Sequence, residues 1–287
     1  MKVARSIAEF ADLRSSLDGG RIVHVPTMGA LHDGHKSLIR LAHSLGDQVV
    51  VSIFVNPLQF GPDEDYARYP RPVGDDLETC LRLGVDLVLV PTVSDLYPAG
   101  RQVMVSAGAM GSVLEGESRP GHFDGVLTVV LKLFNIIRPD VAIFGQKDAQ
   151  QLACVTRMVT DLNLAVEVVG APTVREPDGL ALSSRNIFLS PSHRPLALSL
   201  SAALFQAVGQ DSVPAARQAA YAVLERVESD PAFELQYATV VNPATFAEVG
   251  EGYDGPASFV VAAKVGSTRL VDNAALTFAP VAAVETV

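Results

Sequence analysis

IVHVPTMGALHDGHKSLIRLAHSLGDQVVVSIFV, residues 22–55, is the stretch that decides the fold. An apolar β-branched run leads through a glycine-containing turn into a segment whose apolar residues recur at helical spacing, and a second apolar run follows. This order predicts strands at Ile22–Pro26 and Val49–Val55 around a helix at His35–Leu45, which together form a βαβ unit. Both strands are apolar at successive positions, so we expect helices on both faces of a parallel sheet.

The same alternation continues to about Gly170 and predicts a Rossmann-like, doubly wound α/β domain over residues 1–173. Composition changes after Pro172, where turn-forming residues gather, and residues 174–287 are expected to form a smaller α+β domain. Its last segment, Ala274–Val287, fits an ordered edge or a frayed tail equally well. The further elements expected in the first domain are strands at Val85–Val90, Val141–Phe144 and Val166–Val169 and helices at Gly74–Leu83, Gly125–Ile137 and Asp148–Leu162; in the second they are helices at Pro195–Val208 and Pro214–Ser229 and strands at Glu234–Val241, Ser258–Lys264 and Thr268–Val271.

Composition narrows the class of protein. With 48% hydrophobic and 19% charged residues, the 287-residue chain is typical of a compact globular protein. Its formal net charge of -10 opposes extended contact with nucleic acid or an anionic membrane. Cys80 and Cys154 are isolated, which excludes a CxxC pair, and no apolar run approaches the ~20 residues of a membrane span. We therefore expect a cytoplasmic protein with neither nucleic acid nor membrane as a partner.

The turn after the first strand, Thr27–His35, lies where open α/β sheets bind ligands. Gly29 and Gly34 allow close backbone approach, and the helix start offers unpaired N–H groups to phosphate oxygens. His32 and His35 can face the same anion, although their spacing also fits a metal site or a chance pair at a helix end. The motif TMGALHDGH closely resembles the ATP-binding sequence of pantothenate synthetases, in the nucleotidylyltransferase superfamily with its HxGH signature. That resemblance assigns His35 as the proton donor.

Further motifs resemble the same family. Residues 52–60, SIFVNPLQF, match FVNPxQF, which assigns Gln59 to pantoate and β-alanine. Residues 143–151, IFGQKDAQQ, resemble GEKDxQQ, which assigns Lys147 to ATP and Gln151 to pantoate. Here Gln146 replaces the usual glutamate and Ala149 an aromatic residue, a change that concerns affinity rather than the reaction. DYARYPR at 65–71 resembles a lid-like DxxxYPR segment, HFDGV at 122–126 matches HFxGV, and TRLVDN at 268–273 is similar to TRLIDN.

The segment VREPDGLALSSRN, residues 174–186, resembles VREXDGLAxSSRN, whose serines and arginine suit a mobile loop that closes over phosphates. The smaller domain is thus expected to close over the active site. The resemblance implies His35, His32, Lys147, Ser183 and Arg185 as catalytic residues. Asp75, in the first turn of an expected helix, is a candidate magnesium ligand or a partner of the helix dipole. The implied ATP contacts are Met28, Gly29, Ala30, Leu31, His32, Asp33, Gly34, His35, Gly145, Gln146, Lys147, Asp148, Val174, Leu182, Ser183, Ser184 and Arg185.

The resemblance implies ATP-dependent condensation of (R)-pantoate with β-alanine through pantoyl adenylate, which releases pyrophosphate and AMP in pantothenate and coenzyme A biosynthesis. The resemblance also implies that Mg²⁺ accompanies ATP and that no organic cofactor is bound. It further implies a homodimer. Two other functions fit part of the pattern: another nucleotidylyltransferase or a truncated synthetase acting on RNA, and a nucleotide-binding sensor without catalysis. The paired glutamines argue against the first, and the joint presence of the five catalytic candidates argues against the second.

Overall fold

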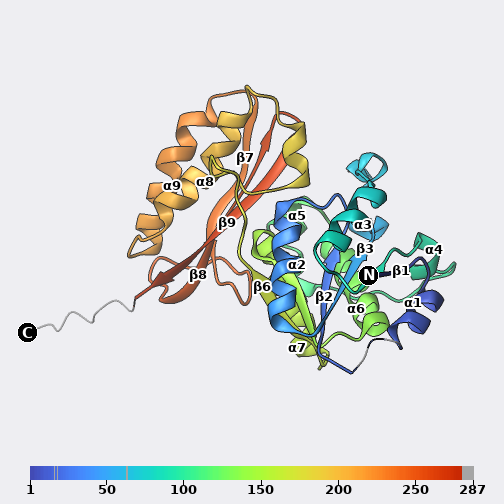
Figure 1. Cartoon of the computed structure of the whole chain (residues 1–287). Coiled ribbons are helices and arrows are strands. Elements are labelled where there is room, and N and C mark those ends of the chain that lie inside the picture. The colour runs from blue at the N-terminus through green and yellow to red at the C-terminus, as the bar shows by residue number, and fades with distance from the viewer. Residues whose placement is uncertain (16, 18, 63, 280–287) are drawn as a thin grey trace, which may run out of the picture. The chain divides into compact units, whose positions relative to one another are not determined.

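The computed structural model describes residues 1–279 apart from 16, 18 and 63. The chain divides into two compact units (Figure 1). The first contains residues 1–146 and 150–174, and the second contains residues 147–149 and the chain from Arg175 onward. The sequence predicted a boundary after residue 173, without the short segment 147–149 that groups with the second unit.

A parallel six-stranded sheet forms the centre of the first unit, with the order β1-β4-β3-β2-β5-β6. Strand β2 pairs with β3 on one side and with β5 on the other, so the direction of winding reverses between β2 and β5. Ligands of open α/β sheets bind outside the carboxyl ends of the strands at such a reversal. The strands are β1 (Lys2–Ala4), β2 (Ile22–Thr27), β3 (Gln48–Ile53), β4 (Leu87–Leu89), β5 (Val141–Gly145) and β6 (Glu167–Ala171).

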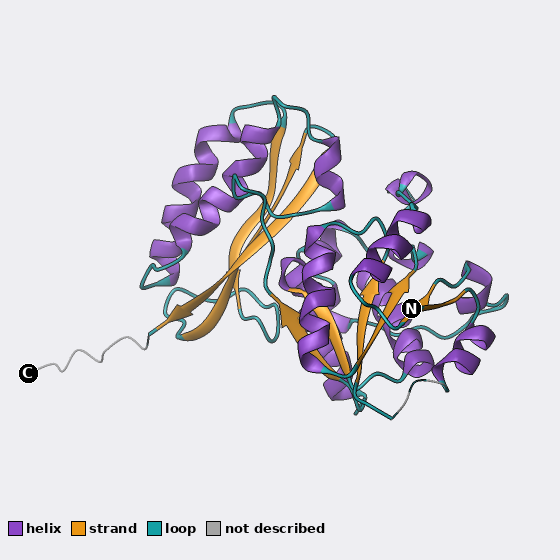
Figure 2. Cartoon of the chain, in the orientation of Figure 1, coloured by secondary structure: helices purple, strands orange, loops and turns teal. Residues whose placement is uncertain are grey.

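Helices cover both faces of this sheet (Figure 2). Helices α2 (Asp33–Leu45) and α3 (Val73–Arg82) pack on one face, against side chains such as Val49 and Val51. The intervening Val50 points to the opposite face, into a second cluster. That cluster is built with α1 (Ile7–Arg14), α6 (His122–Ile137) and α7 (Ala149–Asp161). Burial on both faces explains why the strands are apolar at successive positions.

The second unit has its own core. Its antiparallel sheet has the order β7-β8-β9, and the helices α8 and α9 pack against it. This arrangement confirms the smaller α+β part of the predicted fold class. The elements are α8 (Arg194–Ala207), α9 (Val213–Glu228), β7 (Phe233–Val241), β8 (Gly255–Val265) and β9 (Thr268–Phe278).

Several boundaries differ from those predicted. Strand β9 continues to Phe278 instead of ending at Val271, because pairing with β8 carries it through a polar pair, Asp272 and Asn273. Of the two alternatives left open for Ala274–Val287, an ordered edge or a frayed tail, residues 274–278 take the first, since they continue strand β9; residues 280–287 lie outside the described residues. β1 and α1 were not predicted, nor were the short helices α4 (Val93–Leu96) and α5 (Glu115–Ser118). Asp148 lies in a 3-10 turn, Gln146–Asp148, rather than in α7, while α2 begins at Asp33 and α6 at His122.

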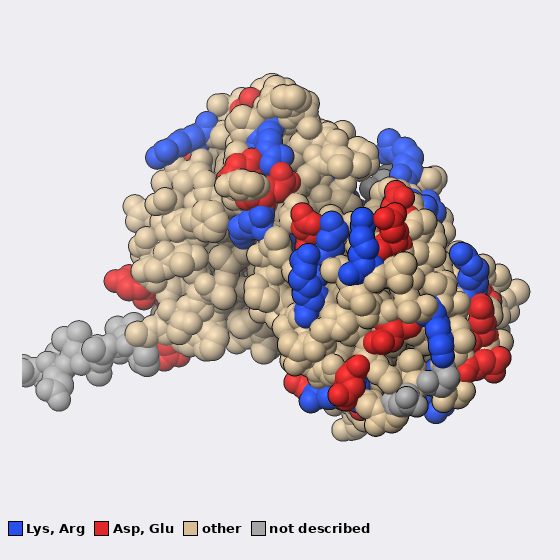
Figure 3. Space-filling model, viewed as in Figure 1, with Lys and Arg blue, Asp and Glu red and all other residues tan. Residues whose placement is uncertain are grey.

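Basic and acidic side chains are interspersed on the face shown in Figure 3. Within residues 1–279, leaving out positions 16, 18 and 63, none of the helices has both the length and the apolar character to cross a bilayer.

Candidate active site

A buried carboxylate fixes the conformation of the turn that follows β2. Gly29 and Ala30 both have positive φ, 84° and 52°, which turns successive N–H groups the same way. The amide nitrogens of Ala30 and Leu31 donate to the two oxygens of Asp76, at 2.9 and 2.8 Å. A Cβ on Gly29 would lie 2.9 Å from Asp76 Oδ2 and 3.1 Å from Ile53 Cγ2. Only glycine fits here, because a side chain would displace the carboxylate that fixes the turn.

The two histidines of the motif cap the start of α2. His32 Nδ1 accepts from the Gly34 amide at 3.2 Å, and His35 Nδ1 accepts from the His32 amide at 3.3 Å. The ring centroids are 4.1 Å apart. Since each Nδ1 acts as an acceptor, the neutral tautomer of each ring carries its proton on Nε2. In that tautomer both rings carry an N–H at Nε2, close to the helix N-terminus, where anions bind favourably.

Gln59 has its amide orientation fixed by its neighbours. Asn56 Oδ1 accepts from the Tyr97 hydroxyl at 2.8 Å and from the Leu58 amide at 3.2 Å. Its Nδ2 must then be the donor, and it donates to Gln59 Oε1 at 3.0 Å. Gln59 Nε2 is left to donate towards the turn after β2, where it lies 3.0 Å from Met28 Sδ. The buried Gln59 thus presents a neutral N–H donor rather than an acceptor.

The main chain of Gln59 is also held from α6. His122 Nδ1 donates to the Gln59 carbonyl at 2.7 Å, and Arg119 Nη2 donates to the same oxygen at 3.1 Å. Burial and the nearby Arg119 lower the pKa of His122 to about 4, so the ring is neutral and its Nε2 accepts from Arg119 Nη1 at 3.0 Å. Arg119 also pairs with Glu64 at 2.5 Å. The loop that carries Gln59 is therefore anchored through both its side chain and its backbone.

Two adjacent glutamines at the start of α7 have different environments. Gln150 is buried; its Nε2 donates to the carbonyls of Met110 and Val113, and its Oε1 accepts from the Glu115 amide. Gln151 is half-buried, and in the range 1–279, with the three gaps excepted, its side chain makes no hydrogen bond. This contrast gives Gln150 a structural role and leaves the amide of Gln151 available to a ligand.

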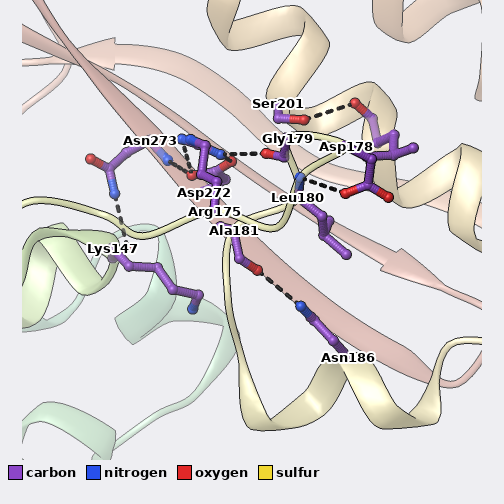
Figure 4. A network of polar contacts seen from close by, with 11 residues as sticks. Lys147, Arg175, Asp178, Gly179, Leu180, Ala181, Asn186, Ser201, Asp272 and Asn273 are labelled. Carbon is purple, nitrogen blue, oxygen red and sulfur yellow. Dashed lines mark hydrogen bonds and ion pairs between the residues drawn. The ribbon is translucent and has the colours of Figure 1, made fainter. Parts of the chain in front are cut away.

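In the second unit, Lys147 is tied to strand β9 (Figure 4). Asn273 Nδ2 donates to the Lys147 carbonyl at 2.8 Å. Lys147 Nζ lies 3.4 Å from Asp148 Oδ1, and the lysine side chain is 21% exposed. A flexible ammonium near the surface suits contact with phosphate oxygens.

The loop with the predicted serines and arginine follows a tight turn in the same unit. Ser183 Oγ accepts from the Arg185 amide at 3.2 Å and begins a 3-10 segment, Ser184–Phe188. Asn186 Nδ2 donates to Glu176 Oε1 and to the Ala181 carbonyl, at 2.7 and 3.0 Å. These bonds close the loop at its base and leave Ser183, Ser184 and Arg185 half-buried along its length.

The predicted site residues divide between the two units. The first unit brings Met28–His35 next to Gln59 and carries Gly145, Gln146, Gln151 and Val174. The second carries Lys147, Asp148 and Leu182–Arg185. Asp75 is exposed in the first turn of α3, and among the described residues no three His, Cys, Asp or Glu side chains are grouped to hold a metal ion.

The sequence reasoning missed several polar residues that support the site. Asp76 lies at helical spacing from the buried Thr79 and Cys80, so the periodicity of α3 indicates a buried carboxylate that needs partners. Tyr97 gave no comparable signal, because it reaches Asn56 only through tertiary packing. The roles of Asp272 and Asn273 depend in the same way on residues more than 90 positions away.

Comparisons with known proteins identify the family of this chain. The family model described as pantoate-beta-alanine ligase matches residues 2–275. A pantothenate synthetase of Thermobifida fusca is 57% identical over 284 residues, which cover 96% of this chain and 95% of that protein. One from Mycolicibacterium smegmatis is 54% identical over 263 residues, 90% of this chain and 81% of the relative.

Solved structures show the same likeness over almost the whole chain. The crystal structure of pantothenate synthetase from Thermus thermophilus has a TM-score of 0.88 at 44% identity and covers 96% of this chain and 99% of its own. The pantoate-beta-alanine ligase of Francisella tularensis, crystallised with beta-gamma ATP and beta-alanine, has a TM-score of 0.78 at 35% identity, with coverages of 96% and 97%. From the family match, the identities and the shared fold, this chain belongs to the pantoate-beta-alanine ligase family, whose members are the pantothenate synthetases.

Proposed function

We propose that this ATP-using ligase joins pantoate to β-alanine in two steps through pantoyl adenylate. In the first, a carboxylate oxygen of (R)-pantoate attacks the α-phosphorus of ATP, and the bond to the β-phosphate breaks to release pyrophosphate. In the second, the β-alanine amine attacks the acyl carbon, loses a proton, and displaces AMP. Both steps depend on alignment of the reactants and on stabilisation of charge at phosphate oxygens, which a site without a covalent nucleophile can provide.

The observation that carries the proposal is the hydrogen bonding of His32 and His35. Both rings use Nδ1 as an acceptor at the N-terminus of α2, so in the neutral tautomer each carries its N–H at Nε2, at a helix end where anions bind favourably. A hydrogen-bond donor that already lies where negative charge develops typically lowers the activation free energy by ~3 kcal/mol. We assign these donors to the departing pyrophosphate, with His35 as the proton donor.

The two glutamines fit recognition of pantoate. Gln59 offers an N–H donor whose direction is set by Asn56, and the Gln151 amide is available to a ligand. A cation clamped on the pantoate carboxylate would make it a weaker nucleophile, whereas neutral amides orient it with less loss of reactivity. This account predicts that Gln151→Arg slows adenylation even if pantoate still binds.

In this proposal the negative charge of the triphosphate is stabilised by Lys147, Ser183 and Arg185, which belong to the second unit. We propose that this unit closes over ATP during the first step and excludes water from the labile anhydride. Limited proteolysis checks closure: ATP with pantoate should protect the 183–185 loop, and an unchanged cleavage rate would contradict it.

Mg²⁺ would enter as part of the substrate MgATP, held chiefly by phosphate oxygens, since the described residues form no cluster of three ligating side chains. The assignment of Asp75 as a protein ligand of Mg²⁺ remains a prediction.

Isotope transfer tests the adenylate directly. Pantoate labelled with ¹⁸O in its carboxylate should pass one labelled oxygen to AMP, because the attacking oxygen stays on the α-phosphorus when the acyl bond breaks. Pyrophosphate exchange into ATP should require pantoate but not β-alanine, and AMP should accumulate only with all three substrates. If the label appeared in inorganic phosphate with ADP as product, the enzyme would use an acyl phosphate and the adenylate route would be wrong.

Assembly and location belong to the same proposal. We propose a homodimer in the cytoplasm, on the basis of the family resemblance and the acidic composition. Light scattering coupled to size exclusion measures the mass in solution, and a monomeric value of 30.4 kDa would contradict the dimer.

A further inference from the structure

Strand β9 carries two polar residues, Asp272 and Asn273, opposite Val261 and Val260 of β8. Asp272 is only 5% exposed, and a buried carboxylate is stable only when it is paired and hydrogen-bonded. The Arg175 guanidinium donates two parallel hydrogen bonds to Asp272, at 2.6 and 3.0 Å. The backbone N–H of Asn273 donates to Asp272 Oδ1 at 2.8 Å. The carboxylate thus fixes both the Arg175 guanidinium and the backbone of Asn273.

From this position Asn273 reaches Lys147, 126 residues away in the sequence (Figure 4). Its Nδ2 donates to the Lys147 carbonyl at 2.8 Å. Lys147 follows β5 of the first unit's sheet, yet residues 147–149 belong to the second unit. A side-chain donor on the main-chain carbonyl restricts the peptide from which the lysine projects, and so restricts where its ammonium can lie.

Arg175 extends the same network to the serine and arginine loop. Its Nη1 also donates to the Gly179 carbonyl at 3.1 Å, and its guanidinium lies 5.2 Å from the centre of the Phe205 ring. Arg175 and Ala181 form an antiparallel bridge that closes the turn. Asn186 then binds the Ala181 carbonyl, so residues 183–185 are held between two anchored positions.

We propose that Asp272 and Asn273 are positioning residues that keep Lys147 and the Ser183–Arg185 loop in one frame for the phosphates of ATP. This inference rests on the proposed function, in which these groups stabilise departing pyrophosphate. Loss of the frame should slow adenylation, because a misplacement of about 1 Å costs on the order of 100-fold in rate. Attack of β-alanine on preformed pantoyl adenylate involves no pyrophosphate and should be little affected.

The test measures the two half-reactions separately in Asn273→Ala and Asn273→Asp. Asn242→Ala is the matched control, since Asn242 Nδ2 also makes a hydrogen bond in the second unit, to Tyr253 Oη at 3.0 Å, away from the network. Pantoate-dependent pyrophosphate exchange should fall by about 10- to 100-fold in Asn273→Ala, with a raised KM for ATP. Asn273→Asp should be at least as slow, because a carboxylate cannot donate to the Lys147 carbonyl. Aminolysis of supplied pantoyl adenylate should stay close to the control in both.

Two results would overturn the inference. Exchange close to that of Asn242→Ala would show that the Lys147 contact does not matter to the chemistry, and an equal loss in both half-reactions would show a general structural role. Wild-type exchange is measured first. Its absence would contradict the proposed function itself, whereas normal wild-type exchange with unaffected variants would contradict only the positioning role.

Discussion

At the scale of single residues, the role proposed for Gln59 depends on which end of its side-chain amide faces the ligand. Asn56 donates to Gln59 Oε1, so Gln59→Glu would keep that bond and replace the N–H donor with a second carboxylate oxygen. That oxygen would repel the carboxylate of pantoate. We expect kcat/KM for pantoate in the exchange reaction to fall on the order of 100-fold, which corresponds to about 3 kcal/mol, with a smaller change in the KM for ATP. Gln206→Glu, on the exposed side of α8, adds the same charge and should leave the rate unchanged; equal losses in both variants would contradict the assignment.

The turn after β2 permits a second test with a matched glycine. Gly29 and Gly100 have almost the same φ, 84° and 83°, but an added Cβ would meet Asp76 at Gly29 and nothing within 4 Å at Gly100. Each alanine substitution should cost about 1 kcal/mol of stability from the backbone conformation. Only Gly29→Ala should also lose exchange activity, because it displaces the carboxylate that orients the Ala30 and Leu31 amides. Chemical denaturation and the exchange assay measure the two effects, and similar activities would show that Asp76 does not shape the site.

Sequence motifs select candidate ligand-binding residues, but they do not show which other residues hold those candidates in place. The positions of His32, His35 and Gln59 follow from local order, because each lies in the turn or the start of the helix that follows a strand. The supports of these residues come from elsewhere in the chain: Asp76 binds the Ala30 amide from 46 positions away, and Tyr97 binds Asn56 from 41. Such partners depend on tertiary packing, for which a single sequence gives at most a helical periodicity.

At the scale of elements, α6 approaches the Gln59 loop more closely than any side chain would allow. A Cβ at Gly125 would lie 2.2 Å from the Leu58 carbonyl oxygen and 2.8 Å from the Gln59 nitrogen. Gly125→Ala should therefore destabilise the protein by about 3 kcal/mol and raise the KM for pantoate, because backbone cannot move aside as a flexible side chain can. Gly74→Ala in α3 meets nothing within 4 Å and should be neutral or slightly stabilising. Urea unfolding compares the two; similar midpoints would contradict the close packing.

Strand boundaries show where sequence patterns stop being informative. The apolar strands between two helical layers were predictable because successive positions in the central strands are buried, as at Val49, Val50 and Val51. β9 was predicted too short because Asp272 and Asn273 resemble a turn, whereas pairing with β8 and the Arg175 ion pair keep them in the strand. The three-residue β1 was not predicted, since its strand character comes from pairing with β4.

At the scale of the whole molecule, the two units bury separate cores and differ in their buried ionisable groups. The first contains His24, fully buried, whose Nε2 lies 2.9 Å from Ser52 Oγ and whose Nδ1 has no partner among the described residues. Burial lowers the pKa of His24 to about 3, and burial with Arg119 lowers that of His122 to about 4. Both histidines belong to the first unit, so acid should weaken that unit through a mechanism independent of the catalytic residues.

The direction of this effect follows from proton binding. An unfolded histidine takes up a proton below pH of about 6.5, while these two stay neutral in the folded state until much lower pH, so their contribution is present above pH of about 6.5 and is lost as pH falls towards 4. By pH 5 each should remove up to about 2 kcal/mol from the free energy of unfolding. Urea titrations at pH 7 and 5 should show a smaller loss in the free energy of unfolding for His24→Gln than for the wild type, because the variant lacks the buried ring. If His24→Gln and the wild type lost stability in parallel, protonation of this buried ring would not be the cause, and the acid sensitivity of the first unit would have to come from His122 or from its carboxylates.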